Sequence, residues 1–132
     1  MDRLTLALAR DIAEAVIVRA RENHFALAVA IVDPGGWPRL QLLMDGAFPA
    51  AGDAALAKAR TAALYRRPTS TFSERVKQGM PLAHLPHVVP LGGGVPLLRQ
   101  GSIYAALGVS GAFEDSETAL AEDVAAAFSD VR

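Results

Sequence analysis

The chain has 132 residues, of which 52% are hydrophobic and 20% charged, and its formal net charge at pH 7 is −1. This length and apolar content suffice for one compact core, which argues against intrinsic disorder and for a single domain over residues 1–132. The near-neutral charge argues against nucleic-acid binding, and no apolar run approaches the roughly 18 residues that cross a membrane. The chain contains no cysteine, so disulfides, thiolate metal sites and a cysteine nucleophile are excluded. We expect a cytoplasmic protein without a metal site.

The first third of the chain predicts a helix followed by a hairpin. Apolar residues recur every three or four positions between residues 2 and 22, which is typical of an amphipathic helix. The continuous apolar run over 26–32 favours a strand that is covered on both faces. Asp33-Pro34-Gly35-Gly36 has the composition of a turn, with a positive φ expected at one glycine or both. The connection to a second strand over 37–44 is so short that the two strands must be antiparallel.

Two helices are expected in the middle of the chain. The Ala-rich segment over 50–66 has a high helix propensity, and Pro68 ends it. Thr71 and Glu74 have the spacing of a capping box, which predicts a short helix over 72–78.

The last third predicts three short strands and a final helix. The strands are expected over 88–91, 95–99 and 102–110. Asp115 or Ser116 is expected to cap the last helix. This order of elements indicates an α+β fold with one five-stranded antiparallel sheet that is flanked by helices.

Several ordered motifs together resemble the GlcG/HbpS-like haem-degrading family, which includes the C-terminal domain of PduO. They are the stretch ALAVAIVDPGGWPRLQLLMDG over 26–46, the run Ala57–Ala63, Gly92-Gly93-Gly94-Val95-Pro96, and Gly108-Val109-Ser110-Gly111. The resemblance spans about residues 4 to 128. It implies a profilin-like, three-layer αβα arrangement, a small-molecule ligand with haem as the candidate cofactor, and a homo-oligomer.

Lys58 is the first candidate for chemistry. Its neighbours at three and four positions along the helix are all small: Ala54, Ala55, Thr61 and Ala62. A lysine on such a stripe is either desolvated, and then suited to act as a base or as the partner of an anion, or extended along the helix surface to water. Glu114 and Asp115 lie next to a helix start. They either stabilise the N-terminus of that helix through its dipole or exchange a proton at the mouth of a pocket.

The glycines and histidines supply further ligand-binding candidates. The backbone N–H groups of Gly92 and Gly93 either form an anion-binding nest or simply permit a tight bend. His84 and His87 lie in a loop, facing either the solvent or a pocket. The hairpin places Asp33 and Trp37 at one end of the sheet. The resemblance implies that many relatives carry His at the position of Trp37. Because Trp37 removes one potential haem contact, we predict that haem binding is weak or unlike that of those relatives.

Two classes of function are compatible with these residues. The first is a small-ligand binding protein, with haem or another tetrapyrrole as the ligand that the resemblance implies. The alternative is a cofactor-independent enzyme that performs isomerase- or lyase-type acid/base chemistry on a small anionic or carbonyl metabolite. In that case Lys58 would stabilise charge while Glu114 or Asp115 exchanges the proton.

Overall fold

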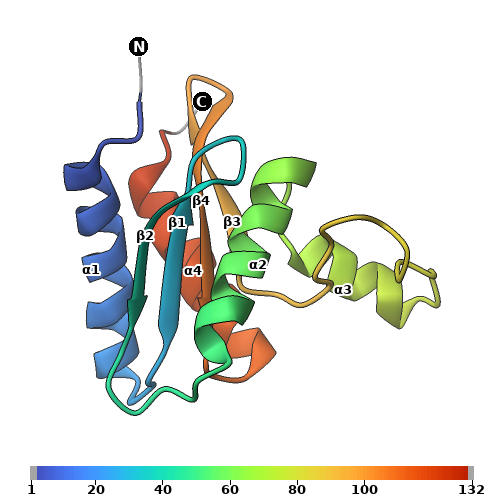
Figure 1. Cartoon of the computed structure of the whole chain (residues 1–132), viewed down its shortest axis with the longest axis horizontal. Helices are drawn as coiled ribbons and strands as arrows, with labels where there is room; N and C mark the ends of the chain where they lie inside the picture. Colours follow the sequence, from blue (N-terminus) through green and yellow to red (C-terminus); the bar gives the residue numbers. More distant parts are fainter. Residues whose placement is uncertain (1–2, 131–132) are drawn as a thin grey trace.

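A computed structural model describes residues 3–130 and shows helices on both sides of an antiparallel sheet (Figure 1). The elements in chain order are α1 (Leu6–Glu22), β1 (Ala28–Val32), β2 (Pro38–Leu43), α2 (Ala51–Tyr65), α3 (Ser70–Lys77), β3 (Gly94–Arg99), β4 (Ser102–Ser110) and α4 (Glu114–Phe128). The strand order is β2-β1-β4-β3, and every neighbouring pair is antiparallel. The α+β class is therefore confirmed. The first helix starts four residues later than expected, and residue 2 lies outside the described residues.

The expected strand over 88–91 is wrong, because the described residues form a sheet of four strands and not of five. The N–H of Val89 donates to the Thr61 hydroxyl at 3.1 Å and not to a neighbouring strand. Pro90 has no N–H to offer to a ladder. The segment is therefore held by a helix side chain and remains irregular.

Both expected helix caps are also wrong. The N-cap residue of α3 is Thr69 and that of α4 is Phe113, and neither makes a side-chain capping bond. Asp115 and Ser116 lie inside the first turn of α4, where the acidic residues face the positive end of the helix dipole.

Alternation along the strands divides the core into two layers. On one face of the sheet, Val29, Ile31 and other large apolar side chains pack against α1 and α4. On the other face, small residues of β1 and β4 pack against α2 and form a second cluster: Ala28, Ala30, Val32, Ala51, Ala55, Ala59, Ala62, Ala63 and Ala106. The arrangement has three layers, helices–sheet–helix, while α3 extends away from the sheet (Figure 1).

Small side chains let α2 approach the sheet closely. A Cβ added at Gly108 would overlap the carbonyl oxygen of Ala55. This close approach fixes the position of α2, which carries most of the residues described below. Within residues 3–130, none of the helices combines the length and the apolar character that crossing a membrane requires.

The hairpin between β1 and β2 confirms the expected turn. Gly36 has a φ of 87°, and the Asp33 carboxylate accepts hydrogen bonds from the N–H groups of Gly35 and Trp37 at 2.9 and 3.1 Å. The turn lies against the end of α2, because a Cβ built on Gly36 would contact the Leu64 side chain at 3.6 Å.

Candidate functional site

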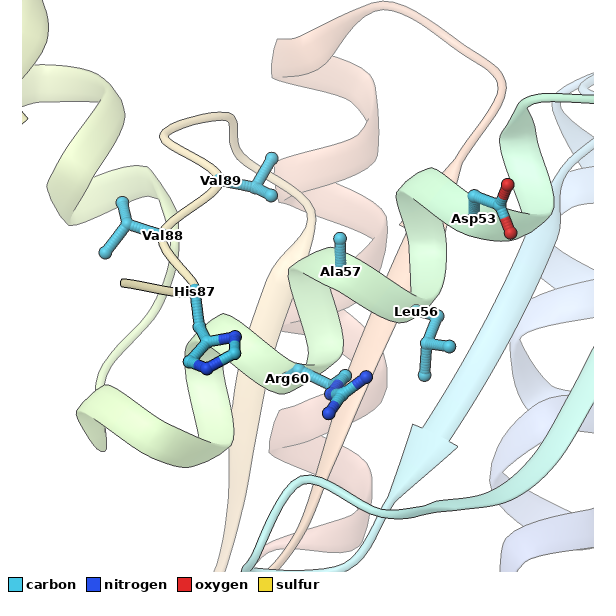
Figure 2. A pocket seen from close by; sticks show the side chains of 7 residues that line it. All are labelled: Asp53, Leu56, Ala57, Arg60, His87, Val88 and Val89. Atoms are coloured by element: carbon cyan, nitrogen blue, oxygen red, sulfur yellow. The ribbon is translucent and has the colours of Figure 1, made fainter. Parts of the chain in front are cut away.

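A pocket of about 270 Å³ lies between α2 and the segment 87–89 (Figure 2). The helix contributes Asp53, Leu56, Ala57 and Arg60, whose spacing of three and four places them on one face. The segment contributes His87, Val88 and Val89. The walls are thus apolar in the middle and carry charged or ionisable side chains at the ends.

Two polar side chains of α2 hold the segment against the helix. The Thr61 hydroxyl lies 2.7 Å from the carbonyl oxygen of His87, to which it can donate, and it accepts the N–H of Val89. The Tyr65 hydroxyl donates to the carbonyl of Pro86 at 2.7 Å. These contacts stabilise the backbone at His87, which has a left-handed φ of 60°. His87 therefore lies at a defined place in the pocket wall. Both histidines are exposed, but His84 is not part of that wall.

Arg60 has a donor with no partner. Its Nε atom is buried and makes no hydrogen bond, and the described residues offer its guanidinium no ion pair. A buried donor without an acceptor is unfavourable, and native structures leave few of them. A guanidinium is also always charged and presents a planar fork that matches a carboxylate. The pocket therefore has the chemistry to hold an anionic group at this end.

Lys58 lies in the interior instead of in this pocket. Its side chain is only 3% exposed, and its Nζ donates to Glu117 Oε1 at 2.8 Å and to the carbonyl oxygen of Val109 at 3.2 Å. The other carboxylate oxygen of Glu117 accepts the N–H groups of Gly111 and Ala112 at 2.7 and 2.8 Å. Of the two alternatives that the sequence left open for Lys58, the structure therefore shows the desolvated side chain, buried among small residues. Its partner is Glu117, which the sequence did not single out.

Glu114 lies near this pair and Asp115 does not share its environment. Glu114 Oε2 accepts the N–H of Gly92 at 2.7 Å. A hydrogen bond from Ser73, followed by the one from Gly92, lowers the pKa of Glu114 below its ordinary 4.5, with Lys77 and Lys58 adding attraction and partial burial opposing. Asp115 is exposed. Glu114 is thus an anionic acceptor that already takes part in a hydrogen bond within the protein.

Gly92 and Gly93 permit close packing. A Cβ at Gly92 would overlap the Thr118 hydroxyl, and one at Gly93, whose φ is 118°, would lie 2.7 Å from the carbonyl oxygen of Val109. The N–H of Gly92 is already used by Glu114. The tight-bend interpretation explains these contacts, whereas an anion-binding role for these glycines stays a prediction.

A family model described as haem degrading protein HbpS-like matches residues 4–126 of this chain. The chain belongs to this HbpS-like family. It is 36% identical to protein GlcG of Escherichia coli K12 over 108 residues, which cover 78% of this chain and 81% of GlcG.

Solved structures agree with this assignment. A crystal structure of an HbpS double mutant from Streptomyces reticuli has a TM-score of 0.87 at 34% identity and covers 98% of this chain and 90% of its own. A crystal structure of a PduOC–haem complex has a TM-score of 0.86 at 27% identity and covers 96% and 95% of the two chains.

In this member of the HbpS-like family, the residues proposed from sequence occupy three separate places. Lys58 forms the interior ion pair with Gly93 and Glu114 close to it, His87 lines the pocket, and Asp33 with the 67%-exposed Trp37 lies at the hairpin. His84 and Asp115 are exposed and belong to none of these places. Sequence reasoning missed Arg60 and Asp53. Arg60 lies inside the motif run Ala57–Ala63, and its spacing of seven from Asp53 was the available signal.

Proposed function

We propose that this chain is a small-ligand binding protein and that its ligand lies in the pocket between α2 and residues 87–89. The observation that carries the proposal is Arg60, a guanidinium in the pocket wall that has no ion-pair partner among the described residues and whose Nε makes no hydrogen bond. Haem or a related tetrapyrrole is the first ligand to test, because a relative of similar fold has been crystallised as a haem complex.

The side chains present are chemically suited to haem. The His87 imidazole is a common axial ligand of haem iron, and Arg60 can pair with a propionate. Leu56, Val88 and Val89 offer apolar surface to a porphyrin. The pocket volume of about 270 Å³ lies just below the range for organic ligands, about 300 to 1,000 Å³, so part of a haem would extend outside it. When bound, haem supplies an iron centre for ligand or redox chemistry, while these residues bind and orient it.

Titration with haemin, followed by the Soret band, tests this proposal. We expect saturation at one haem per chain, weakened by His87→Ala and unaffected by His84→Ala. His84 is the matched control, because it lies in the same loop but outside the pocket lining. Absence of saturable binding would contradict the haem assignment. Native mass spectrometry of the purified protein then identifies any other small molecule that is retained in the pocket.

The enzyme alternative has no comparable support. It required Lys58 to act with Glu114 or Asp115 on a bound metabolite, whereas Lys58 is engaged by Glu117 and by the Val109 carbonyl. A ligand contact by Lys58 stays a prediction, which the Lys58→Met variant tests.

We also propose that the chain forms a homo-oligomer. Three aromatic side chains are exposed, Trp37, Phe48 and Phe113, the last at 83%, and contacts between copies commonly bury aromatic surface of this kind. Native mass spectrometry measures the stoichiometry directly. A purely monomeric protein at micromolar concentration would contradict this proposal.

A further inference from the structure

The pocket separates its charged side chains along the axis of α2. Figure 2 shows Arg60 and the His87 imidazole toward one end, the Asp53 carboxylate at the other, and Ala57 and Leu56 between them. Asp53 and Arg60 are seven positions apart on one helix, which corresponds to an axial distance of about 10 Å. No ion pair links the two within the described part of the chain.

Each end selects a different chemical group. The guanidinium of Arg60 has no ion-pair partner among the described residues, and His87 lines the same pocket, so this end suits a carboxylate. Asp53 offers only acceptor oxygens when ionised, so its end suits an ammonium or hydroxyl group. Its place in the first turn of α2 also favours the helix dipole. The helix dipole explains why an acidic residue stands at position 53, but it does not explain why the Arg60 Nε has no partner.

We infer that the pocket selects a dipolar amphipathic acid. Such a ligand carries a carboxylate at the Arg60 and His87 end, an apolar chain over Leu56 and Ala57, and an amine or hydroxyl at the Asp53 end. This inference rests on the proposed function, because it names the ligand class of the same pocket. Haem satisfies only the carboxylate part of this pattern.

Calorimetric titration with three probes of equal chain length tests the inference. The probe 8-aminooctanoate has both groups, octanoate lacks the amine, and octylamine lacks the carboxylate. We expect 8-aminooctanoate to bind most tightly and octylamine least. Arg60→Gln should weaken 8-aminooctanoate about tenfold or more, and Asp53→Asn should reduce its affinity to that of octanoate. Arg10→Gln, an exposed arginine on α1, is the matched control and should change nothing.

Several outcomes would overturn the inference. Equal affinity for octanoate and 8-aminooctanoate would show that Asp53 does not contribute to binding. An unchanged affinity in Arg60→Gln would show the same for Arg60. Arg60→Lys separates charge from geometry, since it keeps the charge but loses the planar fork. Circular dichroism of each variant checks that the fold is retained. Binding of haemin without binding of any of the three probes would refute the ligand class and leave the proposed function standing. Binding of neither, with no small molecule retained in native mass spectrometry, would refute both.

Discussion

Lys58 Nζ lies 2.8 Å from Glu117 Oε1, and both side chains are buried between α2 and α4. The same ammonium donates to the Val109 carbonyl of β4, so one charged group joins both helical layers through the sheet. Because Glu117 also accepts the N–H groups of Gly111 and Ala112, each of its oxygens has a partner. A satisfied network of this kind specifies one arrangement of the elements that it joins.

Removing the lysine charge is expected to destabilise the fold. Lys58→Met leaves the Glu117 carboxylate buried without a counter-charge, which should lower the free energy of unfolding by about 3–5 kcal/mol. Urea unfolding measures this loss. Lys77→Met is the matched control, because its ion pair with Glu74 is exposed and surface pairs contribute about 0–1 kcal/mol. A Lys58→Met protein of unchanged stability that lost its ligand would instead show Lys58 to be a binding residue.

Gly93 is expected to be intolerant of any side chain. Gly93→Ala places a Cβ 2.7 Å from the Val109 carbonyl and adds the strain of a positive φ. The φ strain alone should destabilise by about 1–2 kcal/mol, and the contact should at least double that loss. Gly79→Ala separates the two causes, since Gly79 has a φ of 89° with open space around it. Equal losses of unfolding free energy in the two variants would contradict the close-packing interpretation.

Glu114 should contribute a pH-dependent part of the stability. Its pKa is lowered in the folded protein, chiefly by the hydrogen bonds from Ser73 and Gly92. A depressed carboxyl pKa stabilises the fold above the ordinary value of 4.5, and that contribution disappears as the pH falls through the lowered value. Glu114→Gln should therefore differ most from the parent protein near pH 7 and converge toward it in acid.

Unfolding of both proteins in urea across this pH range measures the difference. Asp115→Asn serves as the control, because Asp115 is exposed on the neighbouring position of the same helix turn. A constant difference between parent and Glu114→Gln at all pH values would show that the charge of Glu114 contributes nothing.

Trp37 should limit haem binding. The family resemblance implies His at this position after the two glycines of the hairpin, whereas this chain has an exposed indole there. Trp37→His is expected to shift the Soret band of the haemin complex and to tighten binding, since an imidazole can ligate iron and an indole cannot. Trp37→Phe is the control for loss of the indole. Identical haemin titrations for Trp37→His and the parent would exclude a haem contact at this position.

Local chemistry determined most of the secondary structure. Residues 33–36 contain the proline and glycines that a turn requires, and Gly36 adopts the positive φ expected of this pair. The alternation of large and small residues in β1 follows directly from its two buried faces. The strand expected over 88–91 fails because its hydrogen-bond partner is Thr61, which is distant in sequence.

The site depends on contacts that no local pattern contains. The run of small residues around Lys58 was compatible with burial and with exposure. A buried ammonium can take its counter-charge from any element that reaches it, and here Glu117 lies 59 positions away. Arg60 reads as an ordinary charged residue on a helix until the fold brings the segment 87–89 across from it to form a pocket. The sequence by itself determined most of the elements and the family. Only the tertiary structure decided the partners of the buried charges, because ion pairs and pockets form between segments whose separation along the chain carries no information on their distance in space.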